Sequence, residues 1–243
     1  MNVVSRTPRG LPSLDAPRLS SAVQQTLLSC GILAALLYGA MLAFVPLQWG
    51  DYSSASQTVS ELSAIGAPTR PHWVPLGMVY ALLAFAFGFG VWSAVQRNRL
   101  LRVVGGGLIA QSVVSLFWPP MHLRGALPTL TDTMHIVFAM TWLLLMLLIM
   151  AFGAAAFGKR FRIYSAATLA VFVVFGTLAG MDGPRIAANL PTPWSGIWER
   201  INIGASLVWV IVLAVMLLRR ARWGRTPITS VCATPNVKGI APS

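Results

Sequence analysis

The chain has 243 residues, of which 56% are hydrophobic and only 10% are charged, and its mean hydropathy is +0.70. Because a soluble domain carries about 25% charged residues, this composition excludes a soluble globular protein and indicates an integral membrane protein. The net charge of +12 would suggest nucleic acid as the partner of a soluble protein. In a membrane protein, basic residues flank the spans, so we expect the lipid bilayer as partner and no nucleic acid.

Residues 1–21 precede the first apolar run, and their composition predicts a disordered cytoplasmic N-terminus. They contain three arginines, three prolines and a single acidic residue, Asp15. The apolar run that follows is about 25 residues long, which is longer than the hydrophobic region of a cleaved signal peptide. We therefore interpret this run as a retained first span.

Six apolar segments have the length of about 20 residues that crossing a bilayer requires. Backbone groups in hydrocarbon must be satisfied internally, so each segment is predicted to be a helix. The sequence thus predicts an all-α polytopic protein, with six transmembrane helices bundled in a domain over 22–220 and a disordered cytoplasmic tail over 221–243. The predicted spans are 22–46, 74–95, 100–118, 133–157, 162–180 and 199–218.

The charges predict the orientation of these spans. The N-terminus, the two short turns after the second and fourth spans, and the C-terminal tail hold 14 of the 18 Lys and Arg residues. The positive-inside rule therefore predicts that both termini of this multi-pass membrane protein are cytoplasmic. The acids lie on the predicted outer side, with the exception of Asp15. These outer acids are Asp51, Glu61, Asp132, Asp182 and Glu199.

The first long connection contains the pattern of a short capped helix. Thr58 and Glu61 have the spacing of a capping box, and Gly66 with Pro68 provides a stop. We predict a helix over about 58–65, which serves either as a capped interfacial element or as one wall of an outward-facing pocket.

Three motifs together resemble one known family. The stretch from Thr58 to Pro68 (TVSELSAIGAP) is similar to the first-loop signature of the domain-of-unknown-function 998 family. The stretches 132–135 (DTMH) and 196–201 (GIWERI) resemble two further elements of that family, at the starts of the fourth and sixth spans. The resemblance covers roughly residues 25–220. It implies a six-helix bacterial membrane protein and supplies no activity, cofactor or catalytic residue.

The candidate site consists of polar residues on the outer side. Asp132 and His135 share a helix face and form either a cap with a buried histidine or a carboxylate-oriented histidine. A charged Arg200 at the edge of the hydrocarbon is unfavourable in free energy unless it pairs with a carboxylate or reaches the lipid headgroups. We expect it to pair with an acid. The acids named as its candidate partners are Glu61, Asp132 and Asp182. The predicted site comprises Glu61, Asp132, His135, Asp182, Glu199 and Arg200.

Other chemistry has weaker support in the sequence. The three histidines and nearby carboxylates are suitable zinc ligands, but they form no close-spaced ligand motif, so no metal and no cofactor are predicted. A serine hydrolase that pairs Ser60 or Ser63 with His135 lacks the nucleophile-elbow motif. A transporter needs polar groups near the midplane, for which Gln111 is the main candidate, although an interhelical hydrogen bond also explains it.

The sequence favours an integral membrane protein with an outward-facing polar pocket, which is either non-enzymatic or binds a small ligand or lipid. Two alternatives remain open at this point. One is a membrane-embedded enzyme acting on lipid or a small molecule at the outer face, and the other is a small-solute transporter.

The predicted topology can be tested with reporter fusions. Fusions after residues 70, 127 and 190 should report an outside location, and fusions after 98, 160 and 225 should report the cytoplasm, because the basic residues retain their flanking segments inside. One reproducible reversal at any of these positions would contradict the six-span topology.

Overall fold

The computed structural model describes residues 19–94 and 98–223, and the predicted terminal tails lie mostly outside the described residues. Six helices in the described part are long and apolar enough to cross a membrane, which confirms the all-α prediction with six membrane spans. They are α1 (Ser21–Phe44), α2 (Arg70–Ala94), α3 (Arg99–Leu116), α4 (Leu130–Ala156), α5 (Lys159–Met181) and α7 (Ser195–Trp223).

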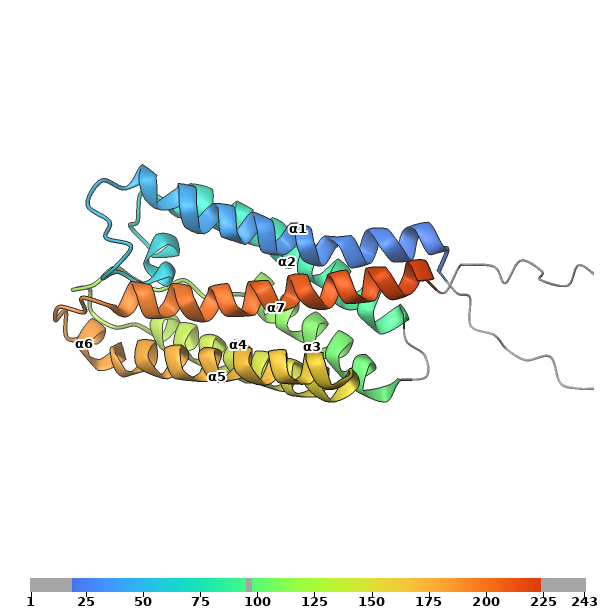
Figure 1. The fold of residues 1–243 in the computed structure, drawn as a ribbon. Helices are drawn as coiled ribbons and strands as arrows, with labels where there is room; N and C mark the ends of the chain where they lie inside the picture. Colours follow the sequence, from blue (N-terminus) through green and yellow to red (C-terminus); the bar gives the residue numbers. More distant parts are fainter. Residues whose placement is uncertain (1–18, 95–97, 224–243) are drawn as a thin grey trace, which may run out of the picture.

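The six spans form a closed ring. Each span packs against the next one along the chain, and α7 returns to α1 (Figure 1). The three long connections, 45–69, 117–129 and 182–194, lie together at one end, which we call the loop end. At the opposite end α1 begins and α7 ends, so the first and last spans enter and leave the bundle on the same side.

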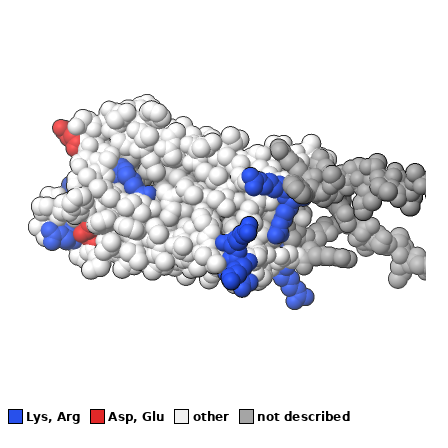
Figure 2. Space-filling model, viewed as in Figure 1, with Lys and Arg blue, Asp and Glu red and all other residues white. Residues whose placement is uncertain are grey.

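Charge is segregated between the two ends of the bundle. Figure 2 shows lysines and arginines gathered near the end at which α1 begins, which we call the basic end, while the acidic residues visible in this view lie at the loop end together with a few basic ones. The basic end carries Arg99, Arg102, Lys159, Arg160, Arg162, Arg219 and Arg220 at the starts or ends of spans. The asymmetry predicted from the sequence is therefore present in the folded bundle.

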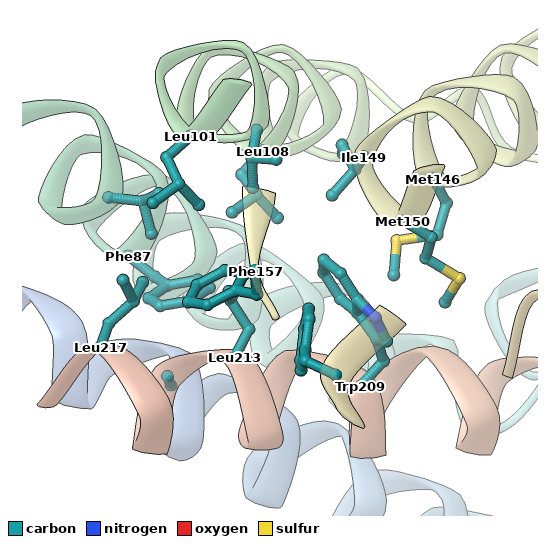
Figure 3. Packing of buried hydrophobic residues seen from close by; sticks show 14 of the residues in the cluster. Phe87, Leu101, Leu108, Met146, Ile149, Met150, Phe157, Trp209, Leu213 and Leu217 are labelled. Atoms are coloured by element: carbon teal, nitrogen blue, oxygen red, sulfur yellow. The ribbon is translucent and has the colours of Figure 1, made fainter. Parts of the chain in front are cut away.

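An apolar core fills the middle of the ring. It takes buried side chains from all six spans, and Trp209 of α7 is fully buried within it. Figure 3 shows Trp209, Phe87, and Met146 and Met150 of α4 pointing into the space between the helices. The Trp209 indole N–H donates to the Ser165 hydroxyl at 2.9 Å, so the polar atom of this large side chain has a partner, as burial requires.

Small residues permit close approach between neighbouring helices. A Cβ atom on Gly105 of α3 would lie 2.6 Å from the backbone nitrogen of Trp92 in α2, and one on Gly88 would lie 2.9 Å from the nitrogen of Ile109. A Cβ on Gly31 or Gly176 would likewise crowd the side chain of Phe87 or Asn202. Gly39 and Gly180 have no such role, because nothing lies within 4 Å of a Cβ at either position.

Few side-chain hydrogen bonds join the spans. Gln111 donates to the Trp142 carbonyl at 3.3 Å, so this midspan amide joins α3 to α4. Asn202 donates to the Phe172 carbonyl at 2.6 Å and joins α7 to α5. The interhelical interpretation of Gln111 is therefore confirmed, and this residue gives no support to a transport path.

Three short helices lie at the loop end. They are η1 (Val45–Gln48), η2 (Val59–Ser63) and α6 (Gly183–Ala187). The predicted helix at 58–65 exists as η2, but it is a shorter 3-10 helix. Its five residues fit the tight i to i+3 bonding that short connecting turns adopt.

Substitution of Gly105 tests the close packing of α2 on α3. We expect Gly105→Ala to lower the free energy of unfolding by about 1–3 kcal/mol, because the added methyl group meets backbone that cannot move aside. Thermal unfolding of the detergent-purified protein, followed by circular dichroism, measures this. Gly77→Ala in α2 is the control, because nothing lies within 4 Å of its added Cβ. The control should be neutral or gain up to about 1 kcal/mol from helix propensity, and equal stability of the two variants would contradict the packing.

Candidate functional site

The three connections of the loop end fold into one polar cap. We use "cap" for residues 45–69, 117–129 and 182–194. Its first connection makes one backbone contact with the second, in which Ile65 N–H donates to the Met121 carbonyl at 2.7 Å. The other hydrogen bonds that join the three connections to one another and to the spans come mainly from side chains. Most of the residues predicted for the site take part in these bonds.

A buried ion pair lies at the centre of the cap. Arg124 Nε lies 2.6 Å from Glu61 Oε1, and Arg124 Nη2 lies 3.2 Å from Oε2, which gives the two-pronged geometry of a strong pair. Glu61 is 1% exposed. The backbone N–H and the hydroxyl of Thr58 also donate to Oε2, so the buried carboxylate accepts four hydrogen bonds.

Arg124 joins all three connections. Besides Glu61, its guanidinium donates to the Ser56 carbonyl at 3.1 Å and to the Thr192 hydroxyl at 2.8 Å. The Thr192 hydroxyl in turn donates to the same Ser56 carbonyl at 2.9 Å. One side chain from the second connection therefore holds the first and third connections together.

The start of α7 holds the first connection against the bundle. Glu199 Oε2 accepts the Val59 N–H at 2.6 Å, at the beginning of η2. The Ile197 N–H donates to the Ala55 carbonyl at 3.2 Å. Gly196 permits this contact, because a Cβ at that position would lie 2.2 Å from the Gln57 carbonyl oxygen.

Arg200 does not pair with a carboxylate, so the prediction that it binds Glu61, Asp132 or Asp182 is wrong. Its guanidinium donates to the carbonyls of Ser54 at 2.9 Å and Gln57 at 3.3 Å, and to its own helix at Gly196. No backbone N–H in the described part of the chain bonds to the Ser54 and Gln57 carbonyls outside the helices. Glu61 of the first connection pairs with Arg124 instead.

Tyr52 completes the surroundings of Arg200. The guanidinium donates to the Tyr52 hydroxyl at 2.8 Å, and that hydroxyl donates to the Thr58 carbonyl at 2.8 Å. Burial raises the pKa of Tyr52 to about 12, although the bond from Arg200 acts in the opposite direction. The phenol therefore keeps the proton that its bond to Thr58 requires.

Asp132 caps α4 and does not orient His135. Its carboxylate accepts the Thr129 N–H at 2.8 Å and the His122 N–H at 2.7 Å, and it lies 3.1 Å from His122 Nδ1. An acid three residues into a helix reaches back toward the N-cap, which directs this carboxylate to the connection. Of the two histidine interpretations, the cap with a separate buried histidine is the one that the structure supports.

His135 points into the bundle, as predicted, and is 5% exposed. Its Nδ1 lies 2.8 Å from the Pro119 carbonyl oxygen and 3.1 Å from Trp118 Nε1. Its Nε2 lies 3.2 Å from the Ser60 hydroxyl oxygen of η2. The imidazole thus connects α4 to the first and second connections.

The remaining predicted residue stands apart from this network. Asp182 lies between α5 and α6, and among the described residues it makes no ion pair. No group of three or more histidine, cysteine or acidic side chains in the described part of the chain could hold a metal ion.

Among the described residues, the polar side chains expected to line an outward pocket do not bond to one another, and most of them bond instead to other side chains and backbone groups of the cap. A hollow of about 230 Å³ does open at this end, between the loop ends of α1 and α2, but its lining is mostly apolar. Its walls are Leu37, Ala40, Met41, Phe44, Val45, Gln48, His72 and Leu76.

Sequence reasoning overlooked Arg124, Tyr52 and Thr192. A signal for Arg124 existed, since it is one of four basic residues on the side where basic residues are rare. The same signal directed attention to Arg200. Nothing in the sequence distinguishes which of the two arginines reaches Glu61.

The central ion pair can be tested with a double-mutant cycle. We expect Arg124→Leu to lower the free energy of unfolding by about 3–5 kcal/mol, because it leaves the Glu61 carboxylate buried without a countercharge. Adding Glu61→Leu should recover part of that loss, with a coupling of about 0.5–3 kcal/mol between the two positions. Thermal unfolding of the four proteins measures the cycle.

Arg185→Leu provides the matched control. Arg185 also lies in a connection at the loop end, but it is exposed and donates to the Pro191 carbonyl within its own segment. Its replacement should change stability by less than about 0.5 kcal/mol. Additive effects of the Arg124 and Glu61 substitutions would contradict the pairing.

Comparison with known proteins places this architecture in a family. Residues 32–216 match the model of the family described as protein of unknown function (DUF998). No curated protein and no solved structure gives a match to the chain. The matched region extends from α1 to α7 and includes the Glu61–Arg124 pair and the start of α7. The chain therefore belongs to the DUF998 family of uncharacterised proteins, here with six membrane-spanning helices.

Proposed function

We propose that this protein binds a membrane lipid at the loop end, with an acyl chain in the hollow between α1 and α2. The observation that carries the proposal is the lining of that hollow, in which six of the eight residues are apolar. Such a surface on the outside of a membrane bundle meets hydrocarbon. At about 230 Å³ the hollow is smaller than the roughly 300–1,000 Å³ typical of drug-sized ligands, and its size suits part of a single chain.

The polar residues beside the hollow suit a headgroup. Gln48 and His72 are the two polar residues of the lining, and His72 is exposed. Arg70 begins α2 at the same end and donates to the Ser63 carbonyl. Because these groups lie at the ends of spans, they sit at the depth of lipid phosphates and glycerol esters, and they favour a lipid with an anionic phosphate.

We infer that the loop end faces outward and that both termini lie in the cytoplasm of a bacterial cell, with the protein in the inner membrane. The gathering of basic residues at the opposite end supports this orientation. The bound lipid would then belong to the outer leaflet.

Photo-crosslinking tests lipid binding in the hollow. Purified protein is reconstituted in vesicles that contain phosphatidylglycerol with a diazirine in one acyl chain, and the adducts are located by mass spectrometry. We expect adducts concentrated on residues 37–48 and 72–76. Ala40→Trp fills the hollow and should reduce these adducts about tenfold, which corresponds to a loss of about 1.4 kcal/mol.

Ala170→Trp is the matched control. Ala170 is an exposed small residue of α5, outside the hollow, so its replacement should leave the adducts at 37–48 unchanged. Adducts spread evenly over the lipid-facing residues of all six spans, with no effect of Ala40→Trp, would contradict the proposal.

A further inference from the structure

Ser60 and His135 bring a nucleophile and a base into contact at the loop end. The Ser60 hydroxyl oxygen lies 3.2 Å from His135 Nε2, which is within the reach that proton transfer requires. Of the serines that the structure describes, Ser60 is the one whose hydroxyl contacts a histidine ring. The equivalent hydroxyl of Ser63, on the same short helix, donates instead to the Ser60 carbonyl at 2.9 Å.

One tautomer of His135 can act as a base toward Ser60. A carbonyl oxygen only accepts hydrogen bonds, so the 2.8 Å contact with Pro119 is a hydrogen bond when the proton is on Nδ1. Nε2 then carries the lone pair and faces the Ser60 hydroxyl. In the other tautomer Nδ1 accepts the Trp118 indole N–H at 3.1 Å and the proton is on Nε2, so a catalytic role for His135 requires the first tautomer.

The surroundings hold both side chains in place. The helix that carries Ser60 is fixed at its start by the bond from Val59 to Glu199, and by the bonds of Glu61 to Thr58 and Arg124. His135 is 5% exposed, whereas Ser60 is partly exposed. A buried base beside an accessible hydroxyl on a supported element is the arrangement that nucleophilic catalysis needs.

We infer that Ser60 and His135 form a catalytic pair for acyl transfer from a carboxylic ester. The Ser60 oxygen bonds to the ester carbonyl carbon while its proton passes to His135 Nε2. The bond from that carbon to the leaving alcohol oxygen then breaks, and His135 gives the proton to the alcohol. In the second half, a water molecule bonds to the acyl carbon, its proton passes through His135, and Ser60 is released as the hydroxyl.

This pair differs from a complete triad in one respect. The group against Nδ1 is the neutral Pro119 carbonyl, and the nearest carboxylate on the helix, Asp132, binds His122 and Thr129. A carbonyl that accepts from Nδ1 orients the ring but supplies no negative charge to stabilise the imidazolium. We therefore expect slow turnover and ready modification by irreversible acylating or phosphonylating reagents. The inference does not depend on lipid occupying the hollow between α1 and α2.

Labelling with a fluorophosphonate probe tests the pair. The full chain in membranes is treated with a biotinylated fluorophosphonate, and the modified residue is identified by mass spectrometry. We expect an adduct on Ser60, none in Ser60→Ala, and a labelling rate at least about 10²-fold lower in His135→Ala. Hydrolysis of p-nitrophenyl butyrate should fall in parallel in both variants.

Ser63→Ala is the matched control, because it removes a hydroxyl from the same helix and leaves the contact with His135 in place. It should label at the rate of the unchanged protein, and thermal unfolding of all variants checks that each is folded. If the contact only ties η2 to α4, Ser60→Ala and His135→Ala will lower stability and the unchanged protein will not label on Ser60. Absence of that adduct, or equal labelling rates with and without His135, would overturn the inference.

Discussion

The buried ion pair between Glu61 and Arg124 holds together three connections that are distant from one another in the sequence. Burying two charges costs several kcal/mol per ion unless geometry and further hydrogen bonds compensate. Here the carboxylate accepts four bonds, and the guanidinium also reaches Ser56 and Thr192. The other contacts of the cap need the first connection held in this position, including the bond from Val59 to Glu199 and the bond from Ser60 to His135.

The middle and the loop end of the bundle satisfy different requirements. In the middle, the helices satisfy their own backbone hydrogen bonds, so apolar packing holds the spans together. The few buried polar side chains there need only single hydrogen bonds, such as the one from Trp209 to Ser165. At the loop end the backbone of the first connection has unpaired carbonyls, and the two arginines donate to them. Arg124 reaches Ser56, while Arg200 reaches Ser54 and Gln57. This accounts for arginines on the side where basic residues are otherwise scarce.

The spans were predictable because hydrophobic length along the chain determines them directly, and the short helix after Thr58 was predictable because its capping signal is local. The pairings were not predictable in this way. Glu61 had four arginine candidates on the same side, and only the fold brings Arg124 to it. Spacing placed Asp132 and His135 on one helix face, but the acid reaches back to the connection while the histidine points inward, so shared spacing did not produce a shared site.

The contact between Glu199 and Val59 joins residues that are 140 positions apart, and this separation has a consequence for biogenesis. At a synthesis rate of about 5–20 residues/s, the first connection is made about 7–28 s before the start of the last helix exists. Arg124 is made 63 residues after Glu61, so the central ion pair can form within that interval, whereas the loop carbonyls that Arg200 binds have no such partner until its end. Maturation of this membrane protein is therefore completed at the loop end, and the nascent first hairpin remains open to chaperones and proteases until the final span is inserted.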